Sequence, residues 1–220
     1  MLGAALVMVV VGCDTGDDLV VDGEVPSSPY GGPLDVPTKE LDEHTPHALR
    51  LASGAAGRAL ECDGEILVGN GPEGWSRGDG GADPEEGLRR YFDLFAPGDP
   101  RSGYRVERRE KDRVLYSYAV AGRTKVAIVV ADDQPGRPGW GPETSASCDL
   151  SELPASYTDS HGIEIWTDGA GGRVPTAEVS SGAGDDHCGW QEVHFLELGD
   201  RRYARDPEGL LEPGMLTAAY

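Results

Sequence analysis

Residues 104–130 read YRVERREKDRVLYSYAVAGRTKVAIVV, and this stretch decides the fold. Apolar side chains alternate with other residues in three consecutive runs, 104–108, 114–120 and 126–130, which is the period of a β-strand with one buried face. The breaks at 110–112 and 121–122 are short enough for tight hairpins. The pattern predicts an antiparallel meander, to which residues 140–148 add a fourth strand.

The strongest helix signal lies directly before the meander. Asp83 is a good N-cap, Pro84 suits the first helical position, and the next two residues are carboxylates near the positive helix end. Apolar residues then recur at helical spacing up to Phe95, so we expect a helix that ends near Ala96. A weaker helix is expected over 45–60 and a short strand over 65–68.

The second half of the chain has the pattern of a smaller β-structure. Strands are expected over 163–166, 177–180, 190–198 and 202–205, the last two joined by a hairpin at Gly199-Asp200. We place the boundary at 149–154, which gives a helix plus antiparallel sheet subdomain over 41–150 and a β-rich subdomain over 151–220. The predicted fold class is α+β: a helix packed on an antiparallel β-meander, followed by a second small antiparallel β-rich subdomain.

The first twelve residues carry no charged side chain and are mostly Val, Leu and Ala. As a helix they reach roughly 18 Å, which is too short for a hydrocarbon core about 30 Å thick. The run ends in Val10-Val11-Gly12-Cys13, which resembles the lipobox of bacterial lipoproteins. The resemblance implies that residues 1–12 are a signal-like segment and that Cys13 is lipidated, which anchors the chain on the outer face of the cell membrane. The family's signals begin with Lys or Arg, and none precedes Cys13 here, so we expect the true start to lie upstream.

The stretch 13–40 that follows is acidic and contains four prolines. It lacks a clear period and predicts a flexible tether. A flexible chain of about 25 residues spans roughly 25 to 30 Å, enough to hold a folded body clear of a membrane.

Composition excludes several classes of protein. The 220 residues include 39 acidic and 19 basic side chains, and a net charge of -20 argues against nucleic acid as a partner. The 32 glycines and 16 prolines predict many turns and exclude long helical bundles. Residues 101–131 are a basic island, with eight basic and three acidic side chains. We interpret it as a solvated sheet face that offsets the acidic remainder; the alternative is contact with an acidic ligand or anionic headgroups.

Three cysteines remain besides Cys13, and they allow three choices of one disulfide. A structural disulfide is the default in an exported chain. We favour Cys62 with Cys148, which leaves Cys188 free or paired outside this chain. Closing a loop of some 86 residues stabilises a fold by about 4 to 5 kcal/mol in the loop-entropy account.

Patterns that would support catalysis or metal binding are weak. Each pattern has too few of the residues that a real site needs to be distinguished from a chance occurrence. We therefore expect no catalytic residues, no metal and no cofactor. The sequence contains Asp185 to Cys188 and His44 with His47 as candidate metal ligands, Thr158 to Gly162 as a serine elbow, Glu164 with Asp168 beside Trp166 as a carboxylate pair, and Arg77-Gly78-Asp79 as an adhesion tripeptide.

Three further stretches, 147–150, 187–191 and 203–207, resemble those of uncharacterised exported proteins of high-GC Gram-positive bacteria. Together with the lipobox-like start, this predicts an extracytoplasmic lipoprotein that serves as a binding or interaction module for an unknown protein or envelope ligand. The alternative is a cell-envelope hydrolase that uses paired carboxylates such as Glu164 and Asp168. A metal-carrying module is a third option.

Overall fold

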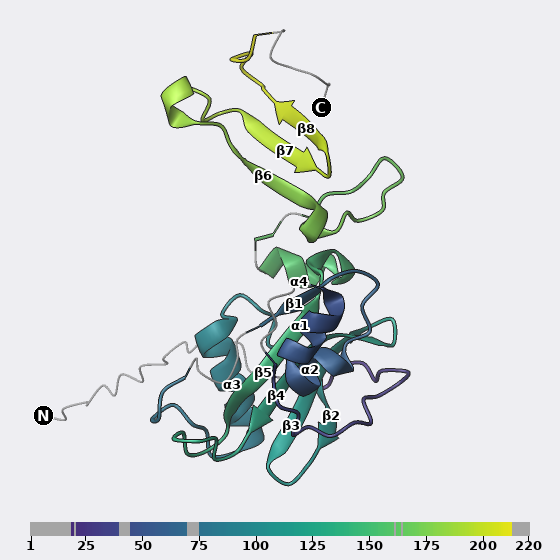
Figure 1. Ribbon diagram of the computed structural model, residues 1–220, viewed down its shortest axis with the longest axis vertical. Coiled ribbons are helices and arrows are strands. Elements are labelled where there is room, and N and C mark those ends of the chain that lie inside the picture. Colours follow the sequence, from purple (N-terminus) through teal and green to yellow (C-terminus); the bar gives the residue numbers. More distant parts are fainter. Residues whose placement is uncertain are drawn as a thin grey trace, which may run out of the picture.

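The computed structural model describes residues 19, 21–39, 45–69, 75–160, 162–163 and 165–212. These residues form two antiparallel sheets, one of five strands and one of three. Figure 1 shows the three-stranded sheet beyond helix α4 (Ala155–Ser160), apart from the larger sheet. The predicted α+β class is confirmed. No helix in this part of the chain is long and apolar enough to cross a membrane.

The five-stranded sheet has the order β1-β5-β4-β3-β2, with every neighbouring pair antiparallel. Its turn between β3 and β4 contains Ala121 and Gly122, both with positive φ, which is the geometry that tight hairpins favour. The predicted meander and its fourth strand are confirmed, and the short strand β1 pairs with the outer side of β5. The strands are β1 (Ile66–Val68), β2 (Tyr104–Arg109), β3 (Arg113–Val120), β4 (Arg123–Ala131) and β5 (Gly141–Cys148).

Helix α3 (Pro84–Phe95) covers one face of this sheet. Its start follows the prediction, because the Asp83 side chain accepts a hydrogen bond from the Glu86 amide at 2.9 Å. Leu88 and Phe92 are fully buried against apolar side chains of β3 and β4. This helix and the sheet form the first of the two core clusters.

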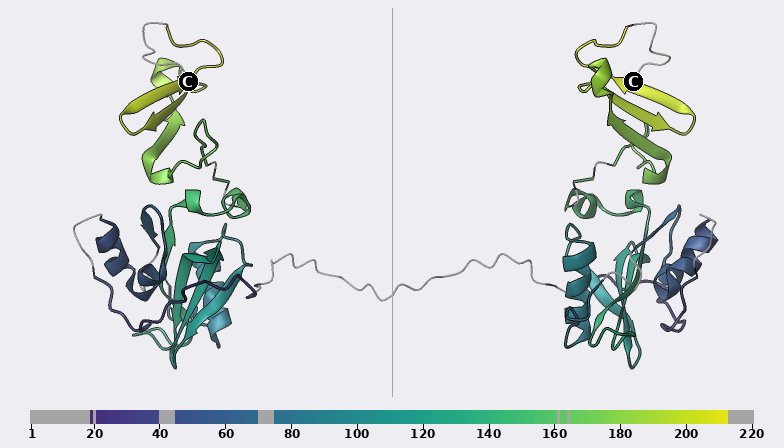
Figure 2. Two further views of the ribbon diagram at one scale, coloured as in Figure 1. Left: turned by 90° about the vertical axis from the view of Figure 1, so that its right-hand side faces the viewer. Right: turned by 60° about the vertical axis from the view of Figure 1, so that its left-hand side comes forward.

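Helices α1 (Pro46–Ala52) and α2 (Gly54–Ala59) cover the opposite face. The single helix expected over 45–60 is divided here because Gly54 has a φ of +55°, which breaks the helical path. Ala55 and Ala56 bury against Leu115 and Val129. Figure 2 shows the sheet between the two helical layers, and this explains why β4 is apolar on both faces.

Residues 21–39 are packed on the larger sheet, so the prediction of a flexible tether is wrong for this part of 13–40. The Gly23 amide donates to the Tyr104 carbonyl at 2.8 Å, and the Tyr30 amide donates to Glu107 at 2.6 Å. A Cβ at Gly23 would lie 2.0 Å from the Gly103 carbonyl oxygen, so only glycine fits this close approach. Leu34 is 1% exposed and anchors the segment, because burying one large apolar side chain stabilises the packing by about 1.5 to 3 kcal/mol. Residues 1–18, with Cys13, lie outside the described residues.

The predicted boundary at 149–154 falls too early. Leu153 and Tyr157 are buried in the first core cluster. The larger body, which is the five-stranded sheet with the segments packed on it, therefore extends through the short helix η2 (Leu150–Glu152) and α4. Local sequence did not reveal this, because two apolar residues in a turn-rich stretch carry no periodic signal. The three-stranded sheet and its loops form the smaller body.

The smaller sheet has the order β6-β7-β8, and its strands are β6 (Val179–Ala183), β7 (His194–Leu198) and β8 (Arg201–Arg205). The hairpin at Gly199-Asp200 is confirmed. The short helix η3 (Thr176–Glu178) occupies the start of the predicted strand 177–180. The described residues of 163–166 form no strand; they precede a loop that the isolated pair Thr167 and Arg173 closes.

Candidate functional site: a pocket on the three-stranded sheet

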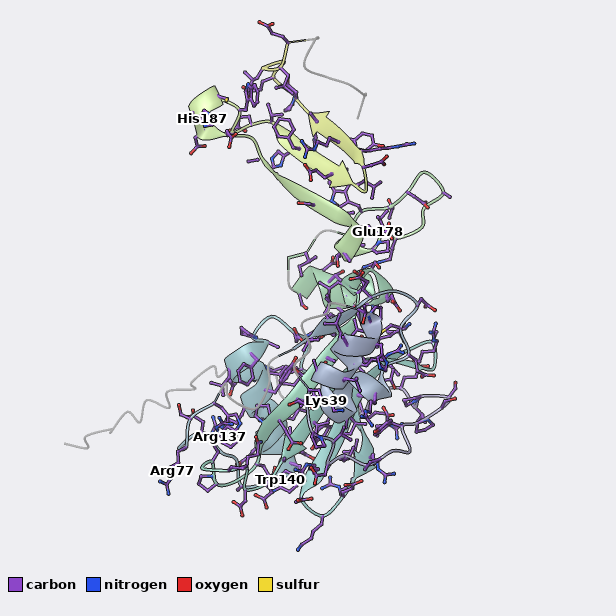
Figure 3. All side chains as sticks on the ribbon, in the orientation of Figure 1. Lys39, Arg77, Arg137, Trp140, Glu178 and His187 are labelled. Carbon is purple, nitrogen blue, oxygen red and sulfur yellow. A yellow bond between two sulfur atoms is a disulfide. The ribbon has the colours of Figure 1, made fainter. Side chains whose placement is uncertain are left out.

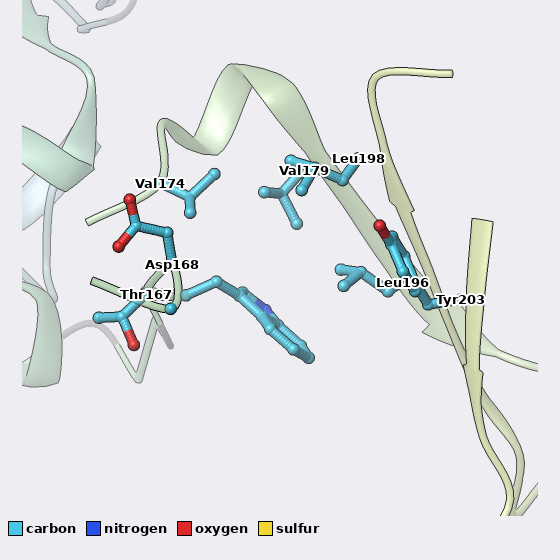
Figure 4. A pocket seen from close by; sticks show the side chains of 9 residues that line it. Thr167, Asp168, Val174, Val179, Leu196, Leu198 and Tyr203 are labelled. Carbon is cyan, nitrogen blue, oxygen red and sulfur yellow. The ribbon is translucent and has the colours of Figure 1, made fainter. Parts of the chain in front are cut away.

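One face of the smaller sheet forms the floor of a pocket of about 430 Å³. Leu196 lies opposite Tyr203 on β8, and Val179 lies opposite Leu198. Because alternate residues of a strand point to opposite faces, these side chains share one face of the sheet. Figure 4 shows Leu196, Leu198 and Tyr203 on one side of the pocket and Asp168 and Val174 on the other.

The opposite wall is the loop from Trp166 to Val174. The Val174 amide donates to the Trp166 carbonyl at 2.8 Å, which brings both residues to the pocket. Inside the loop, the Asp168 carboxylate accepts hydrogen bonds from the amides of Ala170 at 2.9 Å and Gly172 at 2.7 Å. Asp168 therefore acts as a local turn former that holds the wall in place.

The lining suits an apolar or aromatic group. Trp166, Val174, Val179, Leu198 and Tyr203 line it and are all half-buried, so each keeps apolar surface open to a ligand. The volume falls within the range of about 300 to 1,000 Å³ that is usual for small-ligand sites. Asp168 is the single carboxylate among the described residues of the lining, so these residues supply no acid and base pair.

Asp149, at the end of β5, fixes the position of the smaller sheet. Its carboxylate accepts hydrogen bonds from the Thr176 amide at 2.9 Å, the Thr176 hydroxyl at 2.7 Å and the Ala177 amide at 3.0 Å. It also caps η2 through the Ser151 amide at 2.8 Å. Burial raises the pKa of Asp149, but the hydrogen bonds from Thr176 and Ser151 outweigh it, so its pKa lies below the usual value. The hydrogen bonds from Thr176 and Ala177 hold η3, and the strand β6 that follows it, against the larger body.

A second cavity, of about 190 Å³, lies beside α3 and is lined by Tyr91, Asp99 and Tyr157. The Tyr157 hydroxyl donates to Asp99 at 2.5 Å and lies 3.2 Å from the Tyr104 hydroxyl. Burial, and then the Asp99 charge, raise the pKa of Tyr157 well above its ordinary value. Such a tyrosine keeps its proton at neutral pH, so it is a hydrogen-bond donor in the core and a poor nucleophile.

The cysteine pairing that we favoured is confirmed, because the structure joins Cys62 and Cys148. The disulfide ties the segment before β1 to the end of β5. Beside it, the Lys125 ammonium is only 5% exposed and lies 2.5 Å from Glu152 and 3.3 Å from Asp63. Its charge is compensated locally, which accounts for a lysine at a buried position.

Four arginines of the basic island are compensated in the same way. Arg113 lies 3.0 Å from Glu143, Arg123 lies 2.5 Å from Asp63, and Arg101 lies 2.8 Å from Asp93. Arg108 also pairs with Glu110. These pairs favour the interpretation of a solvated face that offsets nearby acid over an anion-binding surface.

Of the other patterns in the sequence, Asp185, His187 and Cys188 bring their ligand atoms together, whereas His47, Ser160 and Asp79 lie on separate segments. His47 is exposed on α1, and its expected partner His44 lies outside the described residues. The Ser160 hydroxyl of the elbow-like stretch donates to the Tyr157 carbonyl at the end of α4, at 2.6 Å. Asp79 caps its own turn through the Ser76 amide at 3.0 Å, and Arg77 extends from this loop in Figure 3. Glu164 lies outside the described residues.

Sequence reasoning found Trp166 and Asp168 but missed most of the pocket. The alternation in 194–198 could have indicated Leu196 and Leu198 as one face of a strand. Val174 carries no such signal, since loop closure alone brings it to the sheet.

Comparisons with known proteins give no relative: no family model, no curated protein and no solved structure matches this chain. The site must therefore be interpreted from its own geometry and chemistry.

Proposed function

We propose that this chain is a lipid-anchored binding module on the outer face of the cell membrane, and that its pocket takes an apolar or aromatic group of an envelope ligand. The observation that carries the binding role is the pocket on the smaller sheet, where Trp166, Leu198 and Tyr203 present half-buried apolar surface around about 430 Å³. Apolar walls of this size gain free energy when a ligand displaces their water.

Two features support the proposed location. The lipobox-like run that ends at Cys13 resembles the signals of bacterial lipoproteins. The disulfide between Cys62 and Cys148 fits a chain that folds in an oxidising compartment, where such bonds persist.

The alternative, a hydrolase with paired carboxylates, receives less support. Its nucleophile or base would have to be free to reach substrate, whereas the Asp168 carboxylate accepts hydrogen bonds from two amides of its own loop. Binding therefore remains the function that this geometry favours.

Binding is tested with Nile red, a neutral apolar dye whose emission rises when it enters an apolar site. Leu198→Ala removes a pocket contact, and Leu94→Ala removes a leucine from the exposed side of α3 as a matched control. Losing one leucine contact of about 1 to 2 kcal/mol should weaken the dye about 5- to 30-fold in Leu198→Ala and leave Leu94→Ala like the parent. Equal affinity in all three proteins would refute the binding site.

Anchoring is tested separately in cells, because it depends on other residues. Radiolabelled palmitate should enter the parent protein, and Cys13→Ala should release the protein into the medium. A parent protein that takes up no label would contradict the anchor and leave the pocket experiment unaffected.

A further inference from the structure

Three different metal-binding groups meet at the turn between β6 and β7. A carboxylate oxygen of Asp185, an imidazole nitrogen of His187 and the sulfur of Cys188 all lie within 4.8 Å of one another. All three side chains are exposed. Figure 3 places His187 at the end of the smaller subdomain that faces away from the larger sheet.

The backbone of this turn holds the three residues in a fixed relation. His187 and Cys188 belong to the short helix η4 (Asp186–Cys188), and Asp185 directly precedes it; the Cys188 amide donates to the Asp185 carbonyl at 3.1 Å. Gly189 ends the turn with a φ of 73°, a conformation that glycine adopts without strain. The Trp190 amide then donates back to the Asp185 carbonyl at 3.3 Å.

The Asp185 side chain is not used to build this turn. Asp149 occupies the same position before η2, and there the carboxylate accepts a hydrogen bond from the Ser151 amide. Asp185 precedes η4 in the same way, yet its side chain makes no cap hydrogen bond. Its carboxylate is instead grouped with the imidazole of His187 and the thiol of Cys188.

The donor set selects one class of ion. A thiolate and an imidazole suit Zn²⁺ and similar transition ions, whereas Ca²⁺ and Mg²⁺ prefer oxygen ligands alone. Bond lengths of about 2.0 to 2.3 Å in a tetrahedral site place ligand atoms about 3.5 Å apart. Since the three atoms already lie within 4.8 Å, rotation of exposed side chains is enough to reach that spacing.

We propose that Asp185, His187 and Cys188 form a three-ligand site for a zinc-class divalent ion, with the fourth position open to water or to a ligand from another molecule. This site is separate from the apolar pocket, whose lining includes none of these residues.

The test uses the full chain in a Cys13→Ala background, so that Cys188 is the free thiol and Cys62 stays bonded to Cys148. Thiol titration should first find one reactive group. Calorimetry should then find one equivalent of Zn²⁺ bound, and Co²⁺ should produce a thiolate-to-cobalt charge-transfer band in the near ultraviolet.

Cys188→Ala should abolish the cobalt band and weaken Zn²⁺ binding about 10-fold or more, and His187→Ala should weaken it similarly. His47→Ala removes an exposed histidine from α1 and should bind Zn²⁺ as the parent does. The proposal is overturned if the parent binds no stoichiometric metal, if Cys188 does not titrate as a thiol, or if Cys188→Ala binds Zn²⁺ as tightly as the parent.

Discussion

The two sheets of this chain are both antiparallel, but they differ in what covers them. Helices lie on both faces of the five-stranded sheet, and β4 is buried at every position after Arg123. In the three-stranded sheet, β6 is exposed from Ser180 to Ala183. Strand pairing alone therefore does not decide the role of a sheet: a doubly covered sheet provides stability, whereas a half-covered one leaves apolar side chains available to a ligand.

The buried side chains reflect the same difference. Tyr104, Tyr116 and Phe92 are fully buried in the larger body, and burial raises the pKa of Tyr116 to about 12. The smaller body has fewer buried apolar residues, among them Val193 and Leu196. Regions with few buried apolar contacts open at lower free energy, so we expect the smaller sheet to unfold first.

The largest expected effect comes from emptying the larger core. Phe92→Ala removes a fully buried ring that packs edge-on against Tyr104, and it should lower the free energy of unfolding of the larger body by about 3 to 5 kcal/mol. Urea denaturation followed by far-ultraviolet circular dichroism measures this loss.

Leu196→Ala is the matched change in the smaller sheet, where the side chain is 8% exposed. It should destabilise only that sheet, by about 2 to 3 kcal/mol, as hydrogen exchange of β6 to β8 would report. If it lowered the stability of β3 and β4 as much as Phe92→Ala does, the two bodies would be one cooperative unit and the comparison would fail.

The next effect concerns the disulfide, which lies entirely in the larger body. Replacing Cys62 and Cys148 together by alanine should lower the stability of that body by about 2 to 4 kcal/mol, because the unfolded chain regains the freedom of a long loop. This is less than the full loop-entropy value of about 4 to 5 kcal/mol, because a reduced unfolded chain keeps residual structure. Hydrogen exchange should increase in β1 and β5 and stay unchanged in β7. Cys188→Ala is the control, since it removes an exposed thiol outside this body.

The smallest expected change in stability comes from Asp149, which joins the larger body to the smaller one. Because hydrogen bonds hold its folded pKa below the usual value near 3.9, the carboxylate stabilises the contact above that value and loses this effect as pH falls through the folded pKa. Asp149→Asn should weaken the attachment of η3 by about 1 kcal/mol at neutral pH.

Limited proteolysis near Thr176 measures this attachment. The parent should become more sensitive as pH falls below about 4, whereas Asp149→Asn should already be sensitive at neutral pH and change little on acidification. If the sensitivity to proteolysis depended on pH in the same way in both proteins, a group other than Asp149 would cause the loss of attachment in acid.

Much of the larger body could be predicted, and the reasons are local. The alternation in 104–130 indicated β2 to β4, and Asp83 with Pro84 indicated the start of α3. The packing of 21–39 could not be predicted, because the amide of Gly23 donates to Tyr104 and the amide of Leu34 to Glu110, each more than 70 residues away. The pocket could be predicted only in part. The sequence indicated Trp166 as a candidate, but its position near Tyr203 depends on a loop and a strand that meet only after folding.

By itself, the sequence determined the α+β class and the hairpins, because both depend on period and turn chemistry. It left three pairings for the disulfide, and the structure shows the favoured one. Tertiary structure decided that the sheet is covered on both faces and that Asp149 holds the smaller sheet in place. It also grouped the donor atoms of Asp185, His187 and Cys188. These features depend on side-chain directions and long-range contacts, which periodicity along the chain does not encode.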